Sequence, residues 1–217
     1  MDNLSLLADR VHQAFEARTH ARDEALSQAR ILTRHCAHAI RAIHRGEQDV
    51  ASDHLSSARE MVAALKRDLA VYPDLFYAGY TQDAIKEFAE ASITTALILN
   101  QPLPMPEDLG VEYNTYLNGL AETTGELRRR CLDILRHGYS DEAERLLAHM
   151  DDIYGLLVTL DFPDAITSNL RRHTDLTRGI VERTRGDMTL ALREQRLQQA
   201  IAEALARLPE SGTPPVG

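Results

Sequence analysis

The stretch "NQPLPMPED", residues 100–108, separates two helix-forming segments and decides how the chain folds. Its three prolines stand at alternate positions, and each lacks an amide hydrogen and clashes with a preceding helical turn, so no helix continues through it. Apolar residues recur with a helical period before it, over 74–99, and after it, over 109–137. The sequence therefore predicts two long helices that a proline loop folds back antiparallel on one another.

The helical period extends toward both ends of the chain, and no segment alternates like a strand. Gly46 and Gly138 each end a predicted helix and begin a similar helix–turn–helix corner. The expected fold class is all-α, a bundle of about six to seven helices in one domain over 1–208, with a disordered tail at 209–217. The other predicted helices cover 3–45, 48–70, 140–160, and a region from Pro163 to about 207 that is interrupted near Gly179 or Gly186.

Composition limits the class of protein. The 217 residues carry a formal net charge of −9, which argues weakly against nucleic-acid binding, although the distribution of charge decides more than its sum. No apolar run of about 18 residues, the length that spans a bilayer, occurs, so no membrane association is expected. Both cysteines, Cys36 and Cys131, stand at apolar helical positions, which favours a reducing, cytoplasmic location.

Two pairs of glutamates occupy the polar faces of the helices on either side of the proline loop. Glu87 and Glu90 are i,i+3 neighbours, and Glu122 and Glu126 are i,i+4 neighbours. If the helices lie antiparallel, the pairs differ in height by only about 8 Å. Four carboxylates at one height would suit Mg²⁺ or Mn²⁺, which prefer oxygen ligands. Spacing alone, however, favours the simpler interpretation that both pairs are solvated.

A row of basic residues lies along one face of the first predicted helix. Arg30, Arg34, Arg41 and Arg45 fall within about 60° of one another on a helical wheel, and such a row can follow nucleic-acid phosphates. The alternative is that these arginines are solvated or pair with acidic side chains. Arg129 shares the glutamates' face of its own helix, where it would contact a phosphate or steady a carboxylate.

Two histidines of the first helix, His35 and His38, are also i,i+3 neighbours. No Cys, Asp or Glu within a turn completes a metal-ligand set on their side. The sequence therefore predicts that they are ordinary helix residues.

Four segments carry a likeness to a known family. The combination of "EFAEA" (87–91) with "YLNGLAETTGELRRRC" (116–131) resembles the translin family, and within it the Trax (translin-associated factor X) branch. The likeness extends to "ARILTRHCAHAIRAIHR" (29–45) and, more weakly, to "LRRHTDLTRGIVERTRGDMTLAL" (170–192). It implies a bundle of helices whose subunits assemble into hollow octamers, with an inner surface that binds single-stranded DNA or RNA.

The resemblance also implies an activity. Trax-type subunits supply a Mg²⁺-dependent endoribonuclease site of acidic side chains, and in this chain the matching residues are Glu87, Glu90, Glu122 and Glu126. The Trax branch carries Asp where this chain has Glu122, which keeps the charge but moves the oxygens by about one bond. In a hollow assembly, the polar helix faces that carry these glutamates could face a water-filled cavity.

We therefore expect an endoribonuclease that uses Mg²⁺ or Mn²⁺ to cleave single-stranded or short RNA, with the basic row and Arg129 contacting phosphates. One alternative is a non-catalytic, translin-like protein that binds single-stranded RNA or DNA. Another is a helical scaffold that binds protein, which predicts an exposed apolar groove instead of nucleic-acid affinity.

Overall fold

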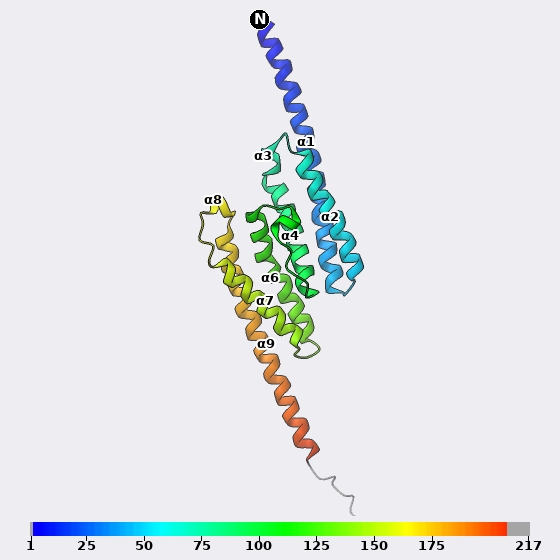
Figure 1. Cartoon of the computed structure of the whole chain (residues 1–217), viewed down its shortest axis with the longest axis vertical. Helices are drawn as coiled ribbons and strands as arrows, with labels where there is room; N and C mark the ends of the chain where they lie inside the picture. The colour runs from blue at the N-terminus through cyan, green and yellow to red at the C-terminus, as the bar shows by residue number, and fades with distance from the viewer. Residues whose placement is uncertain (1, 208–217) are drawn as a thin grey trace, which may run out of the picture.

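The computed structural model describes residues 2–207, and within this range it contains helices and no β-strand (Figure 1). The predicted disordered tail, 209–217, lies outside the described residues. The helices are α1 (Asp2–His44), α2 (Gln48–Asp68), α3 (Pro73–Phe76), α4 (Gly79–Ile98), α5 (Pro106–Leu109), α6 (Tyr113–Leu135), α7 (Asp141–Leu157), α8 (Asp164–Thr167) and α9 (Leu170–Ala206). The expected all-α class is confirmed. None of these helices is long and apolar enough to cross a lipid bilayer.

Helix α4 is the centre of the bundle. It packs against α1 on one side and α6 on the other, while α7 and α9 cover α6 (Figure 1). The core between these helices is apolar and closed, and its large side chains that are less than 2% exposed include Leu32, Ile43, Phe88, Ile93, Leu120 and Leu127. Burial of such side chains stabilises a bundle by about 1.5–3 kcal/mol each.

The proline loop ends α4 as predicted, but the predicted antiparallel pairing is wrong, because α4 and α6 pack parallel along their lengths. Gln82, Lys86 and Glu90 of α4 face Thr115, Gly119 and Thr123 of α6 in the same order. The loop therefore runs back along the bundle before α6 begins. Two contacts hold it against the bundle. The Tyr116 hydroxyl donates to the carbonyl oxygen of Pro104 at 2.7 Å, and Arg59 Nη1 donates to that of Asp108 at 2.5 Å. The loop ends in the single turn of α5, which the sequence did not predict.

Both helix–turn–helix corners are present. Gly46 and Gly138 follow α1 and α6 with φ of 77° and 117°, a region in which residues with a Cβ are strained. These left-handed positions let α2 and α7 turn back along the preceding helices.

Two predicted helices are broken at positions that the sequence did not mark. The segment predicted as 74–99 is α3 and α4, separated by an extended Ala78 (ψ 145°) and tied together by Thr81 Oγ1, which donates to the Leu75 carbonyl oxygen at 2.8 Å. The segment from Pro163 is broken at Ser168 and Asn169, whose φ values are 54° and 68°. Side chains of α6 hold this second break.

The predicted interruption near Gly179 or Gly186 is wrong, because α9 passes through both glycines. A glycine in a helix interior costs only about 1 kcal/mol relative to alanine. The packing of α9 against α6 and α7 offsets that cost.

Helices α4 and α6 come closest at Gly119. A Cβ atom at this position would lie 2.9 Å from the Lys86 carbonyl oxygen and 3.0 Å from the Glu90 amide nitrogen, both backbone atoms of α4. Thr123, one turn later, reaches across the same contact and donates to the carbonyl oxygen of Glu90 at 3.4 Å and to that of Gly119 at 3.0 Å. Only glycine lets α6 lie this near to α4.

We expect Gly119→Ala to lower the free energy of unfolding by roughly 1–3 kcal/mol, because the added methyl group overpacks a contact between two backbones. Gly125→Ala is the matched control on the same helix, where a Cβ meets nothing within 4 Å, and it should stabilise by about 0.5–1 kcal/mol. Urea unfolding of both variants measures the difference. Equal stability for the two would contradict the close approach of the helices.

Candidate functional site

The crossing of α4 and α6 brings three carboxylates together. Glu87 and Glu90 project from successive turns of α4, and Glu122 projects from α6 one turn beyond the contact at Gly119. Each offers an oxygen atom, and these oxygens lie within 4.8 Å of one another. Three of the four glutamates predicted from the sequence therefore form one cluster across the helix pair.

The prediction of a solvated polar face on α4 holds at Asp83 and, in part, at Glu87, and is wrong toward the C-terminal end of the helix. Glu90 is only 9% exposed and Thr94 is fully buried, because α1 and α6 cover the face that carries them. Asn118, on the glutamates' side of α6, is also buried, and its Nδ2 donates to the carbonyl oxygens of Asn114 and Thr167. The glutamates lie at the edge of the core.

Burial changes the acidity of the cluster. The pKa of Glu90 is raised to about 8, first by burial and then by repulsion from Glu87, Glu122 and Glu126. Burial also raises the pKa of Glu87, although Lys86 opposes the change. A positive charge would offset both the burial and the repulsion between the carboxylates. Carboxylates that resist ionisation in this way therefore form a site that favours a cation.

Lys86 supplies one positive charge to the cluster. Its Nζ lies 2.6 Å from Glu122 Oε2, 2.7 Å from Glu122 Oε1 and 3.7 Å from Glu87 Oε1. Burial acts to lower the pKa of Lys86, but the hydrogen bond and ion pair with Glu122 raise it above its ordinary value. The ammonium group is therefore firmly protonated beside the carboxylates.

Glu126 lies one turn along α6 and is held differently. Its Oε2 accepts a hydrogen bond from His44 Nε2 at 2.6 Å and lies 3.5 Å from Arg129 Nη1. The hydrogen bond with His44 lowers the pKa of Glu126, so this carboxylate stays ionised. Glu126 is thus adjacent to the three clustered glutamates, but its oxygens are not among those that meet within 4.8 Å. Arg129 pairs with Glu126, and its predicted contact with a phosphate stays a prediction.

Sequence reasoning missed three residues that contact these glutamates. Lys86 is the one basic residue of α4 and directly precedes Glu87, so a local signal was present. His44 comes from the last turn of α1, and His173, from α9, lies 3.7 Å from Glu122 with a pKa lowered mainly by burial. No local pattern could link these histidines to glutamates so far along the chain.

The basic row of α1 is solvent-exposed. Arg30, Arg34 and Arg41 of α1, and Arg45 directly after it, are all exposed, and among the described residues no carboxylate pairs with any of them. The row ends beside His44, the residue that holds Glu126. The exposed cations and the carboxylate cluster therefore share the C-terminal end of α1.

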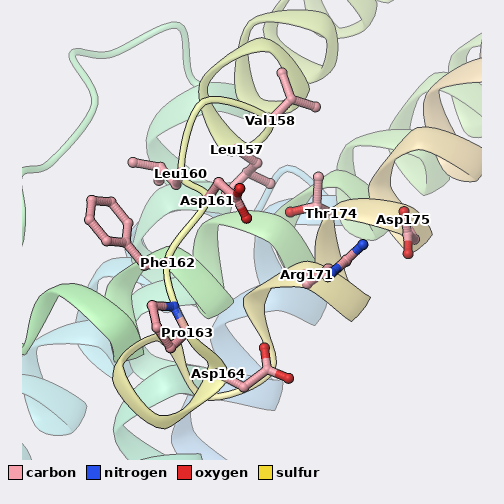
Figure 2. Close-up of a pocket in the computed structure, with 10 residues that line it drawn as sticks. All are labelled: Leu157, Val158, Leu160, Asp161, Phe162, Pro163, Asp164, Arg171, Thr174 and Asp175. Carbon is pink, nitrogen blue, oxygen red and sulfur yellow. The ribbon is translucent and has the colours of Figure 1, made fainter.

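A hollow of about 350 Å³ adjoins the cluster, lined by Lys86 and His173, by one carboxylate, Asp83, and by polar side chains that include Gln82, Asn114 and Asn118. A hollow of about 620 Å³ lies elsewhere, where the α7–α8 connection meets the start of α9 (Figure 2). Three aspartates line that second hollow with a single cation, Arg171, so it repels rather than attracts a polyanion. The hollow beside Lys86 is the one that fits the cluster.

Comparison with known proteins places the chain in a family. No protein-family model matches it. An uncharacterized protein of Methanocaldococcus jannaschii, MJ0175, is 33% identical over 180 residues, which are 82% of this chain and 79% of the relative.

Solved structures are similar to this chain over most of its length. The structure of AfC3PO in complex with duplex RNA superimposes with a TM-score of 0.80 at 34% identity, covering 87% of this chain and 97% of that chain. A crystal structure of AfC3PO also has a TM-score of 0.80, at 33% identity over 87% and 98% of the two chains. Apo-NeC3PO, 18% identical over 84% and 96%, shares the fold with a TM-score of 0.78. The resemblance seen in the sequence is confirmed, and the chain belongs to the translin/Trax family of C3PO proteins.

Proposed function

We propose that this chain is a metal-dependent endoribonuclease that hydrolyses single-stranded or short RNA. The observation that carries the proposal is the meeting of Glu87, Glu90 and Glu122 within 4.8 Å at the edge of the core. A half-buried acidic cluster without a role would destabilise the fold.

The residues of the cluster fit a hard divalent cation. Carboxylate oxygens are the ligands that Mg²⁺ and Mn²⁺ prefer, and the raised pKa of Glu90, about 8, reflects its burial first and then repulsion from the neighbouring glutamates. Glu87, Glu90 and Glu122 would hold the ion, with Glu126 adding negative charge next to them. When bound, Mg²⁺ or Mn²⁺ supplies an activated water and withdraws charge from the phosphate.

Side chains of this chain would accept the proton, bind the phosphate and position the carboxylates. In hydrolysis, a water oxygen bonds to phosphorus, a ribose oxygen leaves, and the proton of the water passes to a carboxylate or to the leaving oxygen. Lys86, released from Glu122 when the carboxylate takes a cation, would place its ammonium group against a phosphate oxygen. His44 keeps Glu126 ionised and fixed in position.

The comparison with AfC3PO favours RNA as the polymer. AfC3PO, which shares the fold at 34% identity, has been crystallised with duplex RNA. In this chain the exposed row of Arg30, Arg34, Arg41 and Arg45 would contact phosphates, since the row ends at the helix turn that carries His44. Arg129, half-exposed beside Glu126, would contact a phosphate near the cluster. Single-stranded DNA would bind the same basic row.

The cleavage test uses the full chain and a labelled single-stranded RNA in Mn²⁺ or Mg²⁺. Wild type should cut within the strand, and Glu87→Gln/Glu90→Gln should lose at least 100-fold in rate, because two of three ligands lose their charge. Glu60→Gln, an exposed glutamate of α2, is the matched control and should cut like wild type. Salt-sensitive RNA binding without cleavage by wild type would instead support the non-catalytic binding protein.

The raised pKa of Glu90 makes a second prediction, for the metal-free protein. Between about pH 4.5 and pH 8 the unfolded chain loses a proton that folded Glu90 retains, so this group lowers the free energy of unfolding as the pH rises through that window. Glu90→Gln, which stays neutral, should therefore be more stable than wild type at pH 8 by up to about 4 kcal/mol and about equal at pH 4.5. Urea unfolding in EDTA at both pH values measures this. A pH-independent difference would contradict the charge assignment.

We also propose that copies of the chain associate. The first turns of α1 and the last turns of α9 project from opposite ends of the bundle (Figure 1). The first carries Leu4, Leu7, Val11 and Phe15 on one stripe, and the second carries Leu190, Leu197, Ile201 and Leu205, all more than a third exposed. Apolar stripes of this kind mark surfaces that another chain covers, and a hollow octamer would use them.

Light scattering coupled to size-exclusion chromatography tests association. Wild type should elute as an oligomer, with eight copies expected, and Val11→Asp/Phe15→Asp should elute at a smaller mass because each change places a charge in an apolar contact. Both side chains are exposed in the single chain, so circular dichroism should stay unchanged. Arg10→Asp, which lies off the stripe, is the control. A monomeric wild type would refute the assembly.

A further inference from the structure

Three histidines gather where α1 packs against α2. His35 and His38 lie one turn apart on α1, and His54 faces them from α2. The Nδ1 atoms of His35 and His54 are 3.1 Å apart. The ring centroid of His54 lies 5.3 Å from that of His35 and 5.0 Å from that of His38. The sequence had offered only the first two residues, and the fold supplies the third.

The distance between the two Nδ1 atoms indicates whether both nitrogens can bind one metal ion. Two neutral imidazoles this close can share only one proton, so one nitrogen donates and the other offers a lone pair. Two nitrogens bound to one tetrahedral zinc ion, each at about 2.0–2.1 Å, lie about 3.3 Å apart. His35 and His54 therefore already stand at nearly the spacing of ligands on one ion.

His38 would complete the set after its ring turns, because the nitrogens of the three rings do not all lie within 4.8 Å of one another. Its side chain is exposed, and within residues 2–207 no side-chain hydrogen bond holds its ring, so the imidazole is able to turn about its side-chain torsions. The i,i+3 spacing from His35 keeps both rings on one side of α1. Three imidazoles leave a fourth position for water, a ligand number that zinc sites use.

We propose that His35, His38 and His54 bind a zinc-class divalent metal ion that fastens α1 to α2. The ligand chemistry separates this site from the glutamate cluster, because imidazole nitrogens select Zn²⁺, Cu²⁺ and Ni²⁺, whereas carboxylate oxygens suit Mg²⁺ and Mn²⁺. The proposal does not depend on the nuclease activity. An ion held by side chains 19 positions apart joins the two helices of the N-terminal corner and stabilises them against separation.

Calorimetric titration of the full chain with Zn²⁺, after metal has been removed, is the test. It is done on Glu87→Gln/Glu90→Gln protein, so that the carboxylate cluster does not contribute. One ion should bind per chain, a large excess of Mg²⁺ should not displace it, and Co²⁺ in its place should give visible absorption bands. At free Zn²⁺ 100-fold above Kd, Tm should rise by roughly 5–10 °C.

Single substitutions on this background assign the ligands. His54→Ala should weaken Zn²⁺ binding by roughly 100-fold and abolish the rise in Tm, whereas His20→Ala, on the exposed part of α1, should bind like the parent. Should His54→Ala fail to fold, His38→Ala replaces an exposed side chain and should weaken binding by at least about tenfold. Absence of zinc binding in the parent, or unchanged affinity in either variant, overturns the proposal.

Discussion

The backbone contact at Gly119 is the constraint on which the site depends. A bundle of apolar helices normally keeps its axes about 8–10 Å apart, with side chains between them. At Gly119 α6 contributes no side chain, and it lies against the Lys86 carbonyl, the Ala89 methyl group and the Glu90 amide. Glu122, one turn later, is thereby brought among the glutamates of α4. The close packing of α4 against α6 and the acidic cluster thus both result from the glycine at position 119.

The meeting of Glu87, Glu90 and Glu122 destabilises the fold, because their carboxylates repel one another. The neighbouring residues reduce this repulsion only in part. Lys86 neutralises Glu122, and His44 holds Glu126, so two of the carboxylates have partners. Glu90 has none of comparable strength and takes up a proton instead, with a pKa raised to about 8. Apolar residues would make this crossing more stable, because an uncompensated buried charge weakens a fold. A cation that enters the cluster turns the repulsion into binding energy, which is the physical reason to assign function here.

The sequence predicted the architecture better than the environment of the site. Helical periodicity, the prolines of 100–108 and the glycines of the two corners are local signals, and the helix ends and corners that they predict are present. Glu87, Glu90 and Glu122 do meet, but the antiparallel pairing from which their meeting was predicted is wrong, because α4 and α6 pack parallel. A helical wheel describes one helix, however, so it assigned Glu90 to a solvated face that α1 and α6 in fact cover. The breaks at Ala78 and Ser168 depend on side chains and packing that periodicity does not express.

Helix α1 connects the apolar surface proposed for association of chains with the basic surface proposed for RNA binding. Its 43 residues contain no proline or glycine, so it lacks the usual sites of a kink. Its N-terminal turns project without packing partners, and an isolated helical segment of that length is marginal in water; association of chains would therefore stabilise this segment. Its C-terminal turns carry the basic row and His44, which contacts Glu126. A rigid helix fixed at one end by another copy would hold His44 and the arginines in place at the other, so that assembly and RNA contact would stabilise each other.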